Sequence, residues 1–491
     1  MTVEALKQII LAKHPETDAT MIDLAYEFAA RAHQGQMRLS GVPYIEHPLA
    51  TAIRLAKMDV DLPTIIAGIL HDVPEDTPVT LKEIEKEFGR EVSTLVSGVT
   101  KLGKIKYRGI SRYAENLRKM FVAIAQDVRV IFIKFADRIN NLETLSHLPP
   151  VKQQRIAQET IEIYAPIANR LGMGELRSEL EDLAFPYVYP DEYAWIKKIT
   201  EAPVIAQKKL VDKMVEEVMI LFQNNHIGAI SVHGRVKHLF SLYKKLLRKD
   251  KDMSKVYDLV AVRIIVKEIK DCYHVLGLIH SRWRPMPGRI KDYISQPKPN
   301  GYQSLHTTVF AETRQVVEFQ IRTETMHELA EYGIAAHWYS KERGLGKKVA
   351  PEQLEWLEQL MKLQKDVNDD EEYLENLKIT LFRDRIFVFT PKGDVINLPE
   401  GATPVDFAYH IHTELGDKLS MVYINEKIAA LDTRLKSGDI IQIITDKARK
   451  GPNEDWLTFV QTKMARDKIQ DFIKRQRRSR IFDLFSRKQT N

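Results

Sequence analysis

Hydrophobic side chains recur at intervals of three and four residues through most of the first 195 positions of the chain. That interval places apolar side chains on one face of an α-helix. The stretches that show it are residues 24–33, 48–58, 62–72, the region around Val122 to Phe135, and residues 153–171. We therefore predict an all-α domain over residues 1–195.

A different pattern follows between residues 196 and 340. Residues 258–266 (DLVAVRIIV) and 315–323 (QVVEFQIRT) are rich in β-branched side chains and alternate between apolar and polar positions, as strands do. Helical spacing returns in residues 237–247 and 326–338. The mixture predicts a second domain, 196–340, of the α+β class.

The last third of the chain divides into three segments. Residues 341–376 contain the acidic, weakly apolar run KDVNDDEEYLENL, which predicts a helical and acidic linker. In residues 377–446 a strand, a Pro/Gly turn, a second strand and a helix precede two further strands, which predicts a small separate domain. Residues 447–491 are predicted to be a basic tail.

Length and composition agree with a globular protein of several domains. A chain of 491 residues is too long for one hydrophobic core. The single cysteine, Cys272, excludes an internal disulfide and a cysteine-based zinc finger, and it agrees with a reducing compartment. Glu4 and Lys7 stand where a signal peptide would be apolar, and no apolar run approaches the length of a membrane span. We therefore expect a cytoplasmic protein that is neither exported nor embedded in a membrane.

Positive charge is concentrated at the C-terminus. Residues 447–491 hold 13 Lys or Arg and 5 Asp or Glu, a net charge of +8 in a chain whose total is +6. A segment such as KRQRRSR attracts nucleic acid, because neutralised phosphates release counterions. The alternative interpretation is a solvated, charged helix end.

Candidate metal ligands stand in three of the predicted helical segments. His47 lies in SGVPYIEHP, His71 and Asp72 close the stretch LPTIIAGILHD, and Asp137 lies in KFADRINNL. Two imidazoles and two carboxylates suit a catalytic divalent metal ion that keeps an open position for water. This combination predicts hydrolase chemistry in the first domain.

Two further acids follow the His71-Asp72 pair. Glu75 is four residues after His71, and Asp76 is four residues after Asp72, so each pair would share a face of a continuing helix. A carboxylate beside the metal can orient a water molecule or take its proton. Pro74 is expected to end or kink this helix.

A second group of residues points to a nucleotide. The chain has no G-x-x-x-x-G-K-[ST] motif, so cationic side chains would have to hold a triphosphate. The segments GRVKHLFSLYKK and GRIKDYISQPKPNGYQSLH supply Arg235, Lys237, Lys245, Arg289, Lys291, Lys298 and the aromatic Tyr302. Charges for phosphates and a ring for a base are the combination that a purine nucleotide requires. A single lysine of this kind is also an ordinary surface charge.

Acidic residues come from both predicted strands of the second domain. Asp258 begins the first strand, and alternation in the second sends Glu318, Gln320 and Arg322 to one face. Asp258 and Glu318 could together hold Mg²⁺ and orient a hydroxyl nucleophile. The alternative is a pair of surface acids matched with Arg263 and Arg322.

The first domain resembles a known family. RLSGVPYIEHP, HDVPEDT, GVTKLGKIKY, AENLRKMF and KFADRINNLETLSHLP are similar to the hydrolase domain of the long RelA/SpoT homologues, the alarmone synthetase/hydrolases. The resemblance implies that the two histidines and two aspartates above bind Mn²⁺, while Glu75 and Asp76 activate water. It also implies that Arg38 stacks on guanine and that ribose and phosphates are held by Ser40, Asn141 and Thr144. The reaction implied is removal of the 3′-pyrophosphate of (p)ppGpp to return GDP or GTP.

Three positions depart from the family pattern. They are Leu39, where Lys is usual, Pro74, where the family has an aliphatic residue, and Asn140, where His is common. None of them is a predicted metal ligand. Loss of the Lys is expected to weaken the attraction for phosphate.

The second domain resembles the synthetase domain of the same family, which is related to nucleotidyltransferases. The strings that carry this are YDLVAVRIIV, KDYISQPKPNGYQSLHTTV and VEFQIRTETMHELAEYGIAAHW. The resemblance implies transfer of the β,γ-pyrophosphate of ATP to the 3′-OH of GDP or GTP, with Glu318 acting on the hydroxyl and Asp258 on Mg²⁺. Tyr302 would stack on the acceptor guanine, beside Gln320 on the substrate face. The residues implied to hold phosphates or adenine are Arg235, Lys237, Lys245, Arg263, Lys298 and His306. RIKD at 289–292 resembles the basic variant of bifunctional members, which favours GDP as the acceptor.

The segment RIFVFTPKGDVINLPEGATPVDFAYHIHTELGDKL resembles the TGS domain, a β-grasp module. The resemblance implies that His412 contacts the 3′-CCA end of deacylated tRNA, whereas a lone His beside an aromatic residue is otherwise a structural feature. Longer relatives continue into a helical region, a zinc-finger-like module and an ACT domain. We therefore expect weaker tRNA or rRNA contact through the basic tail and leave ribosome binding open.

The sequence as a whole predicts a bifunctional enzyme of the stringent response, with an HD-type hydrolase, a synthetase and a TGS module. Two alternatives remain at this point. One is a tRNA-binding regulatory protein whose catalytic domains only sense ligands, and the other is a hydrolase with a silent synthetase.

Overall fold

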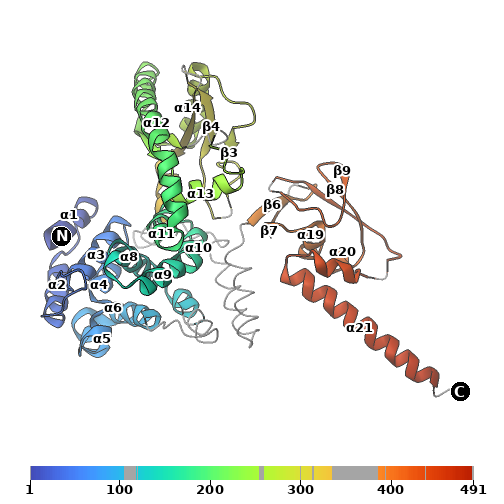
Figure 1. Cartoon of the computed structure of the whole chain (residues 1–491), viewed down its shortest axis with the longest axis horizontal. Coiled ribbons are helices and arrows are strands. Elements are labelled where there is room, and N and C mark those ends of the chain that lie inside the picture. The colour runs from blue at the N-terminus through green and yellow to red at the C-terminus, as the bar shows by residue number, and fades with distance from the viewer. Residues whose placement is uncertain are drawn as a thin grey trace. The chain divides into compact units, whose positions relative to one another are not determined.

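The computed structural model (Figure 1) describes most of the chain. The described residues are 2–103, 118, 120–253, 259–298, 300–311, 315–333, 385–392, 394–436, 438–449 and 451–488. The predicted linker 341–376 and the predicted magnesium ligand Asp258 lie outside them. The chain divides into two compact units, residues 1–371 and 372–491.

The N-terminal part of the first unit is helical, as the spacing of apolar residues predicted (Figure 1). Its helices are α1 (Val3–Lys13), α2 (Thr20–Ala32), α3 (Glu46–Lys57), α4 (Leu62–Leu70), α5 (Val73–Asp76), α6 (Leu81–Gly103), α8 (Arg129–Glu143), α9 (Pro150–Glu159), α10 (Ala165–Arg170) and α11 (Gly174–Val188). A short 3₁₀ turn (Leu145–His147) follows α8, and a π turn (Thr160–Tyr164) joins α9 to α10. Helices α3, α4 and α8 pack against one another, and the predicted metal ligands lie on α3, on α8 and directly after α4.

The start of α4 is fixed by a buried acid. Asp61 caps the helix by accepting a hydrogen bond from the backbone N–H of Thr64 at 3.1 Å. Its other oxygen lies 2.5 Å from Nη1 of Arg129, the first residue of α8. Because Asp61 is 4% exposed, this ion pair compensates a buried charge and joins α4 to α8.

Two predicted helical stretches are interrupted in the structure. Helix α4 ends at Leu70 because Pro74 has no N–H to donate to the next carbonyl of the ladder, although His71 and Asp72 keep helical backbone angles. The stretch around Val122 to Phe135 is broken at Asp127, where the carboxylate accepts a bond from the N–H of Arg129 at 3.0 Å. Periodicity alone did not reveal this break.

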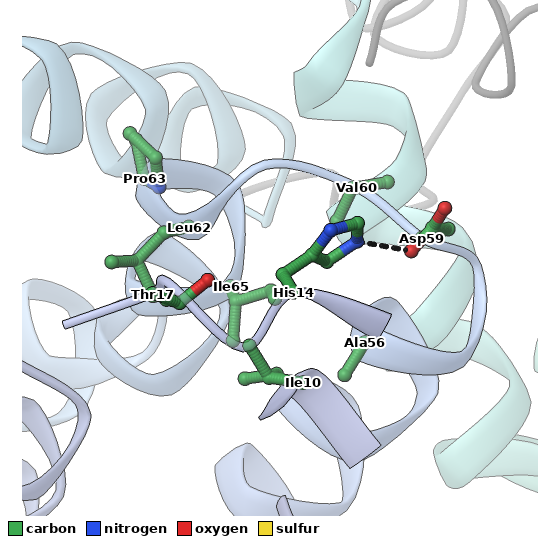
Figure 2. Close-up of a pocket in the computed structure, with 9 residues that line it drawn as sticks. All are labelled: Ile10, His14, Thr17, Ala56, Asp59, Val60, Leu62, Pro63 and Ile65. Carbon is green, nitrogen blue, oxygen red and sulfur yellow. Dashed lines mark hydrogen bonds and ion pairs between the residues drawn. The ribbon is translucent and has the colours of Figure 1, made fainter. Parts of the chain in front are cut away.

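A small cavity of about 160 Å³ lies where α1 meets the α3–α4 corner (Figure 2). Ile10 and Ile65 line it on the apolar side. Nε2 of His14, which also lines the cavity, lies 2.8 Å from Oδ1 of Asp59. Figure 2 draws this contact as a dashed line. Asp59 has a φ of +60°, which a tight corner between two helices imposes on it.

The second part of the first unit is a five-stranded mixed sheet with strand order β1-β2-β5-β4-β3. The strands are β1 (Ala229–Val236), β2 (Val260–Val266), β3 (Lys291–Asp292), β4 (Leu305–Phe310) and β5 (Val316–Thr323). The pair β2 and β5 is parallel, and the other neighbours are antiparallel. The helices are α12 (Pro190–Asn224), α13 (Leu239–Leu247), α14 (Ile269–Arg282) and α15 (Glu324–Tyr332). The predicted boundary at residues 195/196 therefore falls inside the long helix α12.

One face of this sheet is apolar and the other is polar. Phe319 and Ile321 of β5 pack with residues of α12 and α14 in one hydrophobic core. Glu318 and Gln320 alternate with them and are half-buried, as the two-residue period of a strand requires. The predicted catalytic face is therefore the side away from α12 and α14.

The second unit is a small β-grasp-like fold. Its strands are β6 (Arg385–Phe389), β7 (Val395–Pro399), β8 (Leu419–Ile424), β9 (Lys427–Ala429) and β10 (Ile441–Thr445), and its helices are α19 (Pro404–Ile411), α20 (Thr413–Asp417) and α21 (Lys463–Lys488). A 3₁₀ turn (Glu454–Thr458) precedes α21. Val405 and Tyr409 of α19 share a core with Trp456 and Ile469, so α19 lies between the sheet and the C-terminal helix.

Among the helices of the described residues, none combines the length and the apolar character needed to cross a membrane.

Candidate functional sites

Four of the predicted metal ligands lie together in the helical domain. His47 comes from the first turn of α3, His71 and Asp72 follow the end of α4, and Asp137 lies in α8. Nε2 of His47 lies 3.2 Å from Oδ1 of Asp137 and 3.4 Å from Oδ2 of Asp72. Nε2 of His71 lies 3.1 Å from Oδ1 of Asp72 and 4.0 Å from Oδ1 of Asp137. His47, His71 and Asp137 each offer one metal-ligand atom, and these three atoms lie within 4.8 Å of one another. This spacing suits a single ion.

The histidines present the nitrogen that a metal requires. Nδ1 of His71 faces the carbonyl oxygen of Gly68 at 2.8 Å, so Nδ1 carries the hydrogen and Nε2 carries the lone pair. That Nε2 atom is buried and makes no hydrogen bond with any residue that the structure describes. A buried, unpartnered ring nitrogen beside two carboxylates fits a divalent cation.

The charges of this cluster are strongly perturbed. Burial would raise the pKa of Asp137, but Lys134 and the two imidazoles more than offset it, so this pKa lies well below its usual range. Burial would lower the pKa of His47, yet Asp137 and Asp72 raise it to about 9. The cluster therefore holds two anionic carboxylates at neutral pH, and a metal ion would displace a proton from His47.

The two predicted water-activating acids differ in environment. Burial raises the pKa of Glu75 to about 7, and Lys134 opposes that shift. Asp76 is held by Tyr44, whose hydroxyl lies 2.7 Å from Oδ2 of Asp76 and 2.9 Å from Oδ2 of Asp72. The ring of Tyr44 stacks on His33 with centroids 4.7 Å apart, which fixes its position.

Three of the predicted substrate residues of this domain, Arg38, Asn141 and Thr144, lie at the C-terminal end of α8. Arg38 donates from Nη1 to Asn140 at 3.0 Å and from Nη2 to Asn141 at 2.7 Å. Thr144 caps the end of α8 by donating to the carbonyl of Asn140 at 3.1 Å. The Oγ atom of Ser40 is buried and has no hydrogen-bond partner within the described part of the chain. Leu39, where the family usually has Lys, is 71% exposed.

A second site lies on the polar face of the sheet, at a cavity of about 110 Å³. Its lining residues are Ser178, Arg235, Lys237, His238, Ser241, Ala261, Glu318 and Gln320. The predicted residues Arg235, Lys237, Glu318 and Gln320 are among them. The cavity thus brings a cation from β1, Arg235, and one that follows β1, Lys237, together with a carboxylate from β5.

Further predicted residues form a connected row beside this cavity. Nδ1 of His306 lies 2.8 Å from Oε1 of Glu318, and Nε2 of His306 lies 2.9 Å from the hydroxyl of Tyr302. Nζ of Lys298 lies 4.8 Å from the centroid of the Tyr302 ring and 4.7 Å from that of Tyr293. Burial lowers the pKa of Lys298 to about 8, and the neighbouring Lys291 adds to the shift.

Glu175, an acid that sequence reasoning missed, forms ion pairs with two of the predicted phosphate-binding arginines. Oε1 of Glu175, in α11, lies 2.5 Å from Nη2 of Arg235 and 3.0 Å from Nη2 of Arg263. Its Oε2 lies 3.2 Å from Nε2 of His238. Arg263 also pairs with Glu331 of α15 at 2.9 Å. Without a nucleotide, these cations are neutralised by the protein itself.

Three further predicted cations of this domain lie on other elements or at the edge of the sheet. Lys245 lies on α13 and Arg289 precedes β3, and neither lines the cavity. Lys291 pairs with His306 across β3 and β4. In the second unit, His412 is exposed and caps α20, with Nδ1 accepting from the N–H of Glu414 at 3.3 Å.

Sequence reasoning missed several supporting residues. They are His33, Gln36, Tyr44, Lys134, Glu175, His238 and Glu331. Tyr44 lies inside the segment SGVPYIEHP, so its position three residues before His47 was a usable signal. Glu175 is an ordinary surface-type acid in sequence, and only the fold brings it to β1 and β2.

Three family descriptions match the chain. Residues 25–174 match "HD domain", residues 234–345 match "Region found in RelA / SpoT proteins", and residues 386–445 match "TGS domain". The predicted order of an all-α HD domain, an α+β synthetase-type domain and a β-grasp TGS domain is confirmed.

Individual relatives cover nearly the whole chain. It is 46% identical over 483 residues to a GTP pyrophosphokinase of Myxococcus xanthus, which covers 96% of this chain and 62% of that protein. It is 44% identical over 477 residues to the bifunctional (p)ppGpp synthase/hydrolase SpoT of Escherichia coli K12, with 97% of this chain and 68% of that protein covered. The chain thus spans less than two thirds of the Myxococcus protein. Among solved structures, the small alarmone synthetase 2 from Bacillus subtilis is 27% identical over 36% of this chain and 97% of that chain, with a TM-score of 0.25.

The fold and its sites define a multidomain protein in which an HD domain with a buried histidine–aspartate cluster precedes an α+β domain with a basic cavity. The chain belongs to the RelA/SpoT family, as its identity to relatives of the bifunctional type and its three matched regions show.

Proposed function

We propose that this chain hydrolyses (p)ppGpp in its HD domain and synthesises it in its α+β domain. The observation that carries the first reaction is the cluster of His47, His71, Asp72 and Asp137, whose nitrogen and oxygen atoms converge within ion-binding distance. Supporting it, the relative from E. coli is called a bifunctional (p)ppGpp synthase/hydrolase.

In the hydrolase site, these four side chains would hold Mn²⁺, which when bound supplies a Lewis acid that lowers the pKa of water. Glu75, with a pKa raised to about 7, suits the removal of a proton from that water at neutral pH. Asp76, held by Tyr44, would orient it. The water oxygen joins the 3′-linked phosphorus, the bond to the 3′ oxygen breaks, and a proton passes to that oxygen.

The substrate would be bound by side chains at the end of α8. Arg38 would stack on guanine, while Ser40, Asn141 and Thr144 would contact ribose and phosphates. The buried, unpartnered Oγ of Ser40 supports this role, because it leaves a hydroxyl free for a ligand oxygen.

In the second reaction, Glu318 would take the proton of the 3′-hydroxyl of GDP or GTP, which then attacks the β-phosphorus of ATP and releases AMP. His306 is placed to hold Glu318 at 2.8 Å. Arg235, Lys237, Lys298 and Arg263 would bind phosphates, with Lys245, Arg289, Lys291 and Gln320 as further contacts. Tyr302 would stack on the acceptor base. Mg²⁺ would be held with the help of Asp258, and RIKD at 289–292 supports GDP as the preferred acceptor.

Nucleic acid is a further proposed partner. His412 is exposed on the TGS domain, and the helix α21 carries the basic run KRQRRSR. We infer contact with deacylated tRNA, or with the ribosome, through these two features. Since the proposed substrates are cytoplasmic nucleotides, we expect the chain to act in the cytoplasm.

The test uses the purified chain in two assays, ATP with GDP and Mg²⁺, and ppGpp with Mn²⁺. Glu318→Gln is expected to lower synthesis by roughly 10²- to 10⁴-fold while hydrolysis continues, because it removes the proposed general base of the synthetase site and leaves the HD domain unchanged. His71→Ala is expected to abolish hydrolysis while synthesis continues. The two variants control for each other's folding.

Other outcomes separate the alternatives. A wild-type chain that binds both nucleotides and converts neither would be a ligand-sensing regulator. A wild-type chain that hydrolyses ppGpp but does not synthesise it would have a silent synthetase, and Glu318→Gln would then leave its total activity unchanged.

A further inference from the structure

One amide oxygen joins two parts of the hydrolase site that have separate proposed roles. Oδ1 of Asn140 lies 3.0 Å from Nη1 of Arg38 and 2.6 Å from Nδ1 of His47. Asn140 is 8% exposed and lies on α8, three residues after Asp137. A carbonyl oxygen has two lone pairs, so it can accept from both neighbours at once.

The chemistry of these partners leaves one arrangement of hydrogens. A guanidinium donates hydrogen bonds and cannot accept them, so the amide atom that faces Arg38 is the oxygen. Nδ1 of His47 faces the same oxygen and therefore carries a hydrogen. The other nitrogen, Nε2, is then the one available to a metal ion, and it lies 3.2 Å from Oδ1 of Asp137.

The arginine is needed for this arrangement. Without Arg38, the amide of Asn140 can rotate by half a turn and present its NH₂ group to Nδ1 of His47. That contact would favour the tautomer whose hydrogen is on Nε2, which cannot bind a metal. Arg38 does not belong to the metal cluster, yet it sets which atom of Asn140 faces the metal ligand.

We propose that Asn140 is a positioning residue that holds His47 in its metal-binding form and ties this ligand to Arg38. A ligand that binds Arg38 would therefore affect the metal centre through a single atom, Oδ1 of Asn140. The role of Arg38 as a substrate contact rests on the proposed function, whereas the effect of Asn140 on metal binding does not.

The first measurement is Mn²⁺ affinity of the nucleotide-free full chain, by electron paramagnetic resonance titration. All variants carry Glu318→Gln, which weakens the predicted metal site of the other domain. Asn140→Leu, of similar volume but without an acceptor, is expected to weaken Mn²⁺ binding by about 10- to 100-fold. Asn140→Asp keeps an oxygen in place and is expected to stay within about threefold. Thermal melts followed by circular dichroism verify the fold of each variant.

The second measurement is a double-mutant cycle with Arg38→Ala. Removal of the Arg38 charge would by itself tighten Mn²⁺ binding, because a nearby positive charge repels the ion. We expect the opposite, a several-fold weakening, because the Asn140 amide is then free to rotate. In the Asn140→Leu background, Arg38→Ala is expected to cause no weakening. If Asn140→Leu fails to fold, the Arg38→Ala variant alone decides the proposal, because weaker Mn²⁺ binding supports it and tighter Mn²⁺ binding contradicts it.

Three results would overturn the proposal. They are wild-type affinity in Asn140→Leu, equal losses in Asn140→Leu and Asn140→Asp, and tighter Mn²⁺ binding in Arg38→Ala. If the Mn²⁺ affinities change as expected but the chain does not hydrolyse ppGpp, the proposed function is contradicted and the inference about Asn140 still stands.

Discussion

At the scale of single residues, burial decides how Lys298 can act. Its ammonium lies between the rings of Tyr293 and Tyr302, at 4.7 and 4.8 Å from their centroids. Burial is the main reason that its pKa is lowered to about 8, and Lys291 contributes in the same direction. The nucleotide-free site therefore holds a lysine that loses its charge just above neutral pH.

A pH dependence of the proposed GDP binding follows from the lowered pKa of Lys298. A bound diphosphate favours the charged ammonium, so binding above pH 8 takes up a proton and weakens as pH rises, by at most about tenfold per unit. Calorimetry at pH 7.5 and 9.5, in buffers of different ionisation enthalpy, measures both effects. Lys298→Arg keeps its charge over this range and is expected to give a flatter profile. Equal pH profiles in the two proteins would contradict the assignment.

At the scale of elements, Asp406 joins the start of α19 to the segment before α21. It is 0% exposed and accepts hydrogen bonds from the N–H and hydroxyl of Thr403, each at 2.9 Å. It also accepts from the N–H of Gln461 at 2.9 Å, and from the N–H and hydroxyl of Thr462 at 2.7 and 2.8 Å. A buried carboxylate with these donors acts as a helix cap and a cross-link between two helices.

Asp406→Asn is expected to destabilise the second unit by about 3 kcal/mol, because one acceptor oxygen is replaced by a donor among buried donors. Amide hydrogen exchange of α19 in the full chain should show the lost protection. Asp432→Asn removes the same charge from an exposed position of the same unit and is expected to leave exchange unchanged. Unaltered exchange of α19 in Asp406→Asn would refute the cross-link.

At the scale of the whole first unit, α11 is shared by the helical domain and the α+β domain. It packs against α8 of the helical domain and against α13 and α15 of the α+β domain. On one side, Glu179 pairs with Arg54 of α3 at 2.7 Å. On the other side, Glu175 pairs with Arg235 at 2.5 Å, so the phosphates of the proposed nucleotide would have to displace a carboxylate carried by this helix.

Glu175→Gln is therefore expected to bind ATP or GDP about 5- to 20-fold more tightly than the wild-type chain, since an amide competes less well for Arg235. Titration calorimetry on a Glu318→Gln background prevents turnover during the measurement. Glu179→Gln removes the same charge one turn along α11, away from Arg235, and is expected to change nucleotide affinity little. Unchanged or weaker nucleotide binding in Glu175→Gln would refute the competition.

The local parts of this protein were determined by its sequence. Apolar spacing predicted α3, α4 and the strands β2 and β5, because the periods of helices and strands are properties of neighbouring residues. The residue types suited to a metal ion were likewise visible, since His71 and Asp72 are adjacent in sequence.

Only the tertiary structure decided which ordinary residues complete each site. Asn140 meets Arg38, Tyr44 meets Asp76, and Glu175 meets Arg235 across long separations in sequence. No local pattern marks such contacts, because an amide, a phenol or a carboxylate acquires its role from the partner that packing brings to it. The physical reason is that hydrogen bonds and ion pairs act over a few ångströms in space, whatever the distance along the chain.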